Sequence, residues 1–265
     1  MLDTSVLLDR LDEYSENSDV SIESISARIK EDEAFVITEG KALFLDNNLL
    51  SSGHTATQTF KVGDPIGFAE ALSKQIDTIR FKEIEPISLK KIDGELIRKT
   101  IENCDFLPKE IIRYSIARIF NRARNRPNPV FEDRLLEVFR NEIAPASFRS
   151  GQTIFNYGVP ASAIFFIDKG LVNLQTMKNR TLATLGETEC FGEGSLISSR
   201  RRSLKAVAKT DCTLFRIDES VFNQRLEKEH PLVQLTLVQV VKRLHLMNQL
   251  RLIGSGDSVF QISGD

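Results

Sequence analysis

Short apolar segments separated by glycines dominate the sequence between residues 148 and 217. They are rich in β-branched and aromatic residues, and glycines such as Gly158 and Gly170 separate several of them. Short strands separated by glycines and polar turns are typical of a β-sandwich or a β-barrel. The segments expected to form strands are Thr153–Phe155, Ile164–Ile167, Leu171–Leu174, Thr181–Leu185, Leu204–Ala208 and Cys212–Ile217.

The hydrophobic period changes after residue 230. Apolar residues now recur close to the helical spacing, and Pro231 suits the first turn of a helix. We therefore expect a helix that begins near Pro231. The apolar positions are Leu232, Leu235, Val238, Val241, Leu244 and Leu246.

Residues 191–203 have the composition of a loop that holds a small anionic sugar phosphate. Gly192 permits a tight turn, and small residues after it leave backbone N–H groups free to face an anion. Arg202 can make a two-pronged bond to phosphate oxygens. Glu193 would repel a phosphate, so its natural partner is a hydroxyl such as a ribose 2′-OH. Taken alone, the run is better explained as a solvated arginine patch on the surface.

The flanking pattern favours the ligand loop. Residues 144–250 resemble a cyclic nucleotide-binding domain of the kind found in bacterial catabolite-activator proteins and kinase regulatory subunits. The resemblance implies an eight-stranded jelly roll with helices at its ends and a phosphate-binding cassette over residues 191–203. The matching blocks are Phe148-x-x-Gly151, Gly158, Phe166-Ile167-x-x-Gly170-x-Val172, Phe191-Gly192-Glu193, Arg202-Ser203 and Lys209-Thr-Asp-Cys212.

The resemblance also implies roles for single residues. Glu193 would accept from the ribose 2′-OH, and Arg202 would pair with the cyclic phosphate. Gly192, Gly194 and Ser195 would face the phosphate through their backbone amides, while Ser203 would reach the phosphate or the purine. The expected walls of the nucleotide site are Leu174, Leu182, Ala183 and Phe191, with Met247, Asn248 or Gln249 of the last helix over the base; we take Asn248 as the candidate. The sequence departs from the family pattern at Gly194 and Arg201.

The first half of the chain reads as a second copy of the same domain. Gly67 and Gly192 differ by 125 positions, as do Ile92 and Ile217. At this offset Phe68 stands for Glu193 and Asp77 for Arg202, so both chemical anchors are lost. We expect a degenerate domain over residues 1–126 and a binding domain over residues 127–265, with the junction near Pro127 to Pro129 and a hairpin insertion in the first copy around Asn47 to Thr55. The expected fold class is mainly β with flanking helices, in two tandem eight-stranded rolls.

Composition and motifs exclude several other classes of protein. The chain of 265 residues is 41% hydrophobic and 27% charged with a net charge of −2, so nothing drives it toward nucleic acid. No apolar stretch is long enough for a membrane span. Three scattered histidines and the lack of a catalytic signature predict neither a metal site nor an enzyme. Cys104, Cys190 and Cys212 are expected to be free thiols, mostly buried, in a reducing compartment.

These features predict a cytoplasmic receptor for cAMP, or in second place cGMP, that signals through an unknown protein effector. Only Ile253 to Asp265 follow the last helix, too few residues for a DNA-binding domain. Two alternatives stay open: a scaffold that needs no ligand, and a receptor in which Arg200 to Arg202 bind a cyclic dinucleotide. The apolar side of the last helix fits a homodimer as well as a cover for the jelly roll. The sequence does not choose between cAMP and cGMP.

Overall fold

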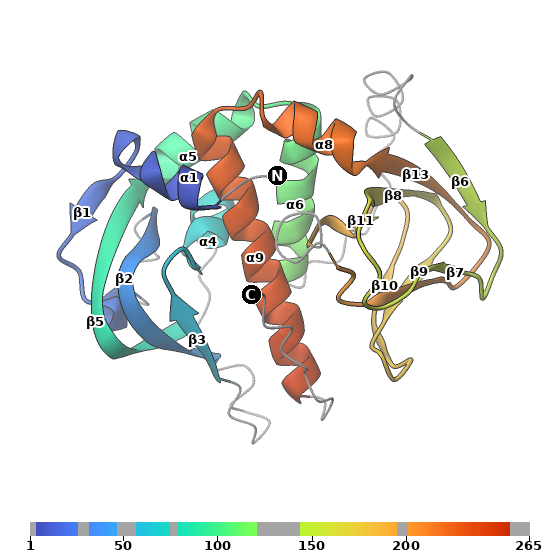
Figure 1. The fold of residues 1–265 in the computed structure, drawn as a ribbon, viewed down its shortest axis with the longest axis horizontal. Coiled ribbons are helices and arrows are strands. Elements are labelled where there is room, and N and C mark those ends of the chain that lie inside the picture. Colours follow the sequence, from blue (N-terminus) through green and yellow to red (C-terminus); the bar gives the residue numbers. More distant parts are fainter. Residues whose placement is uncertain are drawn as a thin grey trace. The chain divides into compact units, whose positions relative to one another are not determined.

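The structure is a computed structural model that describes residues 4–25, 32–46, 57–74, 79–120, 144–194 and 201–254. Contacts within the chain divide it into two compact units (Figure 1). Unit 1 comprises Asn121–Glu227, together with Met1, and unit 2 comprises Leu2–Phe120 and Lys228–Asp265. Unit 1 is thus almost continuous in sequence, whereas unit 2 combines the first part of the chain with the last.

Unit 1 is built from two antiparallel four-stranded sheets in its described part. One sheet has the order β10-β9-β12-β7 and the other the order β11-β8-β13-β6. Helix α8, at Glu219–Leu226, follows the last strand. The strands are β6 Ala144–Phe148, β7 Thr153–Phe155, β8 Ala163–Lys169, β9 Val172–Gln175, β10 Thr181–Leu185, β11 Cys190–Phe191, β12 Lys205–Ala208 and β13 Cys212–Asp218.

Alternating burial explains why these segments form strands around a core. In β9 the side chains of Val172 and Leu174 are buried, and the residues between them are less so. One side of such a strand faces the core while the other faces outward. The turn before β9 needs a glycine, because Gly170 has φ of 91° and a Cβ there would lie 2.3 Å from the carbonyl oxygen of Asp211.

Unit 2 contains one sheet with the order β1-β5-β2-β3, and β4 pairs with β2 beside this path. Its two central strands are long, and together they bury an aromatic cluster in which Phe44 stacks on Phe60 at 4.9 Å between ring centroids. The strands are β1 Glu16–Ser18, β2 Glu33–Asp46, β3 Thr57–Lys61, β4 Pro65–Ile66 and β5 Ile79–Asp93. The helices are α1 Thr4–Asp9, α4 Phe68–Ser73, α5 Gly94–Glu102, α6 Phe106–Ile119 and α9 Pro231–Gly254, with short 3-10 turns at Leu11–Glu13 and Ile22–Ser24.

Local capping explains where two of these helices begin. The carboxylate of Asp93 accepts a hydrogen bond from the backbone N–H of Leu96 at 2.8 Å, and α5 begins at the next residue. The carboxylate of Asp105 likewise accepts a hydrogen bond from the backbone N–H of Leu107 at 3.0 Å, and α6 begins at Phe106. At the position aligned with Asp93, Asp218 precedes α8 in unit 1. Both units therefore pass from their last strand into a helix through an aspartate.

The expectation of a mainly β fold with flanking helices is confirmed. All six strand segments expected in the second half occur, and the last helix begins at Pro231. Helix α8, at Glu219–Leu226, was not among the elements expected from the sequence. The hairpin insertion around residues 47–55 and the junction at 127–129 lie outside the described residues. Among the helices that the structure describes, none is long and apolar enough to cross a membrane.

The last helix is where the structure differs from the predicted boundaries of 1–126 and 127–265. Those boundaries assigned the helix to the second domain, but α9 belongs to unit 2, where it contacts α1, α4, α5, α6 and β4. Its burial explains the difference: nearly every residue from Leu232 to Leu244 is buried, and a helix buried on all sides needs partners all round. From the sequence, the apolar side of this helix was expected either to form a homodimer or to cover the jelly roll of the second domain. Packing within unit 2 was not expected.

The three cysteines are thiols rather than disulfides, and Cys190 and Cys212 are buried. Burial raises the pKa of the half-buried Cys104 thiol to about 12 and also raises the pKa of Cys212. Because the thiolate is the reactive form, we expect the folded protein at pH 8 to react with a thiol reagent at least about tenfold more slowly than the protein unfolded in urea. Absorbance of the released chromophore measures this. A thiol that reacts equally fast in both states would contradict the prediction.

Candidate ligand site around Arg202

Arg202 lies near the C-terminal end of the predicted cassette, in unit 1, and is only 3% exposed. Its backbone N–H donates to the carbonyl of Val159 at 2.9 Å, and its own carbonyl accepts from the N–H of Gly158 at 2.8 Å. These two bonds hold the chain around Arg202 against the Gly158 turn. The arginine is therefore fixed by its backbone as well as by its side chain.

The guanidinium of Arg202 spans two backbone carbonyls. Nη1 donates to the oxygen of Gly192 at 2.9 Å, and Nη2 donates to the oxygen of Ala163 at 2.6 Å. Its Nε is buried and has no hydrogen-bond partner among the described residues. The Nε–H is thus available to a ligand, and a bound anion can also compete for the two terminal nitrogens, which now bond to backbone carbonyls.

Aromatic rings line one side of this guanidinium. The Cζ atom of Arg202 lies 4.1 Å from the ring centroid of Phe155 and 5.8 Å from that of Phe165. Phe165 in turn stacks on Phe191 at 5.4 Å. A cation over an aromatic face is stabilised by the ring quadrupole, which offsets part of the cost of burying the charge.

Burial sets the electrostatics of the site. Loss of water lowers the pKa of Arg202 to about 10, and the negative charge of the nearby Glu193 opposes that shift. Arg202 still carries its charge at neutral pH. Glu193 is also buried, with 6% exposure. A buried cation and a buried carboxylate at one turn can select a ligand that has an anion on one side and a hydroxyl on the other.

Gly192 brings these groups together. It has φ of 90°, and a Cβ at this position would lie 2.4 Å from Nη1 of Arg202. Glycine is required here both for the backbone conformation and for the close approach of the guanidinium. A helical turn begins directly after it, at Glu193 and Gly194. Ser195, whose backbone amide was predicted to face the phosphate, lies outside the described residues.

Three of the four predicted wall residues belong to the cluster behind Arg202. Leu174 and Phe191 are part of the buried core, and Ala183 packs against it. Leu182 is half-buried and sits at a register shift between β10 and β9, outside that cluster. Ser203 directly follows Arg202 and is half-buried. Asn248 lies on α9 in unit 2, so it does not belong to the unit that holds the cassette.

Sequence reasoning missed Phe155 and Phe165 as parts of the site. Both were expected only as strand residues, although they carry the rings over which Arg202 lies. The available signal was the alternation of side chains along each strand. Phe155 and Phe165 lie on consecutive strand segments of a roll, and inward-facing residues of such segments come close together in its core. Neither residue belongs to the motif around Arg202, so the motif alone could not identify them.

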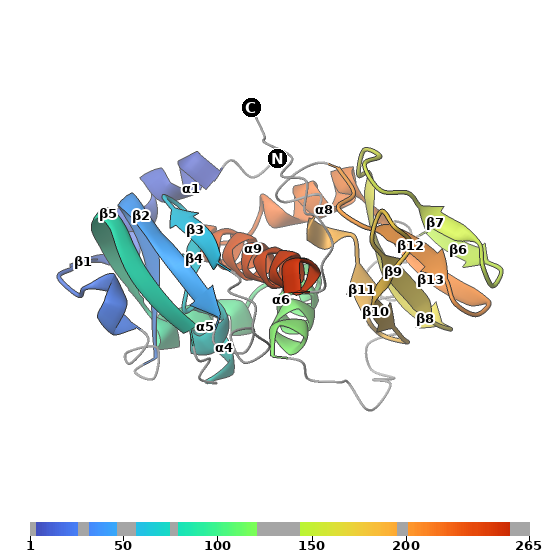
Figure 2. The ribbon, with the colours of Figure 1, turned by 90° about the horizontal axis from the view of Figure 1, so that it is seen from below.

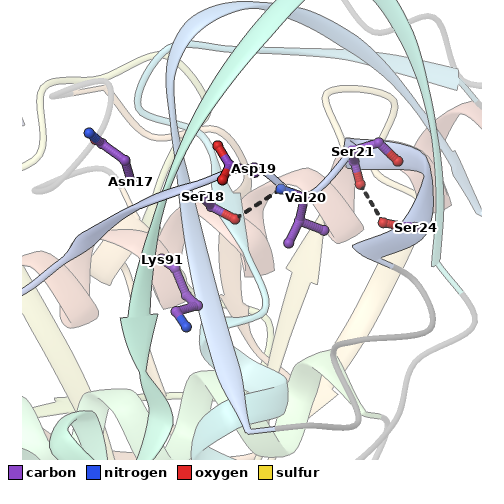
Figure 3. Close-up of a pocket in the computed structure, with 7 residues that line it drawn as sticks. All are labelled: Asn17, Ser18, Asp19, Val20, Ser21, Ser24 and Lys91. Atoms are coloured by element: carbon purple, nitrogen blue, oxygen red, sulfur yellow. Dashed lines mark hydrogen bonds between the residues drawn. The ribbon is translucent and has the colours of Figure 1, made fainter.

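A hollow in unit 2 is a weaker candidate. Figure 3 shows it lined by Asn17, Ser18, Asp19, Val20, Ser21, Ser24 and Lys91. Lys91 already pairs with Glu33 at 3.4 Å and Glu16 at 3.7 Å, and Ser24 donates to the carbonyl of Ser21 at 2.8 Å. These groups are engaged within the protein, and none of the predicted site residues lines the hollow. In the described part of the chain, no group of three or more histidine, cysteine, aspartate or glutamate side chains is placed to hold a metal ion.

Comparison with known proteins gives a match over the same region. Residues 145–229 match the family described as "Cyclic nucleotide-binding domain". The cAMP-dependent protein kinase regulatory subunit of Eremothecium gossypii is 31% identical over 86 residues, which are 32% of this chain and 19% of that protein. The human potassium/sodium hyperpolarization-activated cyclic nucleotide-gated channel 4 is 28% identical over 132 residues, 50% of this chain and 10% of the channel. The chain thus spans a fifth or less of the length of these relatives.

Solved structures show looser likeness. The cAMP-bound form of the EAL enzyme Bd1971 is 28% identical and covers 41% of this chain and 31% of that chain, with a TM-score of 0.36. The cAMP-bound PfPKA-R is 14% identical and covers 98% of this chain and 94% of that chain, with a TM-score of 0.40.

Proposed function

We propose that this chain, in which residues 145–229 are a cyclic nucleotide-binding domain, is a receptor for a cyclic mononucleotide, cAMP in first place and cGMP in second. One working site, in unit 1, would bind it. The observation that carries the proposal is Arg202, a buried cation that lies against the turn at Gly192 with a spare donor at Nε. A buried charge is costly unless it is paired, and a cyclic phosphate is a suitable partner.

The proposed roles follow the chemistry of each group. Arg202 would exchange its bonds to the carbonyls of Gly192 and Ala163 for bonds to phosphate oxygens, with Phe155 behind it. Glu193 would accept a hydrogen bond from the ribose 2′-OH. Backbone amides from Gly192 to Ser195 would face the phosphate, and Ser203 would lie beside it. Leu174, Ala183 and Phe191, with Leu182, would form the apolar wall.

Titration calorimetry with cAMP tests the proposal. We expect one cAMP molecule to bind per chain, and we expect cGMP to bind with equal or lower affinity. We also expect 2′-deoxy-cAMP to bind about 10–100-fold more weakly, because it lacks the hydroxyl that would donate a hydrogen bond to Glu193. No heat with either cyclic nucleotide would refute the receptor. Equal binding of the deoxy analogue would refute the role of Glu193 alone.

A scaffold that needs no ligand is the second candidate. The observation in its favour is that the two terminal nitrogens of Arg202 already bond to backbone carbonyls, so the arginine has a structural use without a ligand. The same titration separates the two, because a scaffold gives no heat. We propose further that the protein is cytoplasmic and not an enzyme, that it signals through a protein partner, and that unit 2 derives from a second roll.

A further inference from the structure

Helix α9 packs against the helices and strand β4 of unit 2. It packs beside α6 and reaches the end of the sheet that carries β3 and β4 (Figure 2). Near its C-terminal end, Met247 is 8% exposed and belongs to the aromatic cluster that includes Phe44, Phe60 and Phe81. Helix α9 therefore contacts the other helices of unit 2, and its Met247 side chain also packs into the aromatic core beside the sheet.

Two donors of α9 bind one carbonyl oxygen in the turn between β3 and β4. The side-chain amide of Gln239 donates to the carbonyl oxygen of Gly63 at 3.2 Å, and Nζ of Lys242 donates to the same oxygen at 2.9 Å. Gly63 lies in the turn between β3 and β4, shortly before Gly67. Burial lowers the pKa of Lys242, and the charge of Asp64 opposes this. The helix is therefore attached at the turn that leads into α4.

A buried ion pair continues the attachment. Nη2 of Arg243 lies 3.9 Å from Oε1 of Glu70 in α4, and the two residues are 4% and 2% exposed. The Cζ atom of Arg243 lies 4.8 Å from the ring centroid of Phe44. Removing one partner of a buried pair leaves an uncompensated charge, which is strongly destabilising. The ion pair therefore adds a polar contact of defined position to the apolar packing of α9 against unit 2.

The arrangement repeats the chemistry of the Arg202 site with an arginine from elsewhere in the chain. In unit 1 a left-handed glycine, Gly192, opens a helical turn, and Arg202 lies over Phe155 near Glu193. In unit 2 the left-handed Gly67 opens α4, and Arg243 lies over Phe44 near Glu70. The position aligned with Arg202 is Asp77, which lies outside the described residues.

We propose that α9 is a built-in occupant of unit 2. Arg243 and Met247 fill the space beside the Gly67 turn and the aromatic cluster, where a ligand would otherwise bind, and Glu70 pairs with Arg243 instead of with a ligand. A unit filled in this way takes no free nucleotide while α9 is docked. This inference does not depend on whether unit 1 binds a nucleotide.

Charge reversal in the full-length chain tests the occupant. In Arg243→Glu, two carboxylates would face each other in the interior, so α9 should leave its place. We expect amide protection of α4 and of the β3–β4 turn against hydrogen exchange to fall by about 100-fold or more. We also expect the dye ANS to bind the exposed aromatic cluster. The matched control is Lys99→Glu, which reverses a charge that pairs with Glu95 on the exposed side of α5.

The double variant Glu70→Arg with Arg243→Glu restores opposite charges and should recover at least tenfold of the lost protection. Met247→Gln keeps the ion pair and places an amide in the aromatic cluster, and it should expose the same amides. Amides of β6–β13 in unit 1 serve as the internal standard for folding. Unchanged protection of α4 in both Arg243→Glu and Met247→Gln would overturn the proposal, and so would a double variant that is no better than the single one.

Discussion

Replacing Arg202 with glutamine should weaken cAMP binding by about 30-fold or more. The change removes a buried cation that would make charge-assisted bonds to the phosphate, and truncating such a pair costs about 2–5 kcal/mol, where each 1.4 kcal/mol is tenfold. Arg202→Lys keeps the charge but loses the forked geometry, so its affinity for cAMP should lie between that of the unsubstituted protein and that of Arg202→Gln. Calorimetry measures each affinity, and circular dichroism checks that each variant is folded.

Arg201→Gln is the matched control. Arg201 is exposed and donates to the carbonyl of Gly158 at 2.9 Å, so it contributes little to a site around Arg202. Its loss should leave cAMP affinity within about twofold, as for most exposed substitutions. A cyclic dinucleotide carries two phosphates and should depend on both arginines. Unchanged cAMP affinity in Arg202→Gln would contradict the proposed site.

Replacing Phe44 with alanine should destabilise unit 2 by about 3–5 kcal/mol. Phe44 is 1% exposed, and it contacts Phe60, Phe81 and Arg243 at once. Its removal creates a cavity and takes away the ring over which Arg243 lies. Hydrogen exchange of β2, β3 and β5 measures the effect, since the chain contains no tryptophan to report on unfolding.

Ile84→Ala is the comparison for Phe44. Ile84 lies on β5 in the same unit but is 54% exposed, so its truncation should cost about 0.5 kcal/mol or less. Equal loss of protection in the two variants would contradict the placement of Phe44 in the core. If unit 1 holds the working site, cAMP binding should survive in Phe44→Ala wherever the chain stays folded.

The strands of unit 1 were predictable because their signal is local. Each segment, such as Thr181–Leu185, carries its own period and its own flanking turn, and both are visible in sequence. The proximity of Gly192 and Arg202 was predictable for a similar reason. Gly192, Glu193 and Arg202 are close in sequence, and their chemistry depends on one turn. The structure places Gly192 and Arg202 in direct contact, with Glu193 buried beside them.

The parts that sequence could not predict depend on long-range packing. The apolar period of residues 231–246 shows that a helix needs partners, but it does not say which unit supplies them. The bond from Gln239 to Gly63 joins residues 176 positions apart, and no local pattern encodes such a pairing. The same holds for Phe155 beside Arg202, because Phe155 comes close only through the pairing of β7 with β12, in which Phe155 faces Ala206.

The division of the chain also sets an order for its synthesis. Unit 1 is almost continuous in sequence and can fold once residue 227 has left the ribosome, whereas unit 2 begins first and is completed last. Until Pro231–Gly254 emerges, Glu70 and the aromatic residues of the first sheet await their partners. The nascent N-terminal segment is therefore the part of this protein that most needs protection from aggregation during translation.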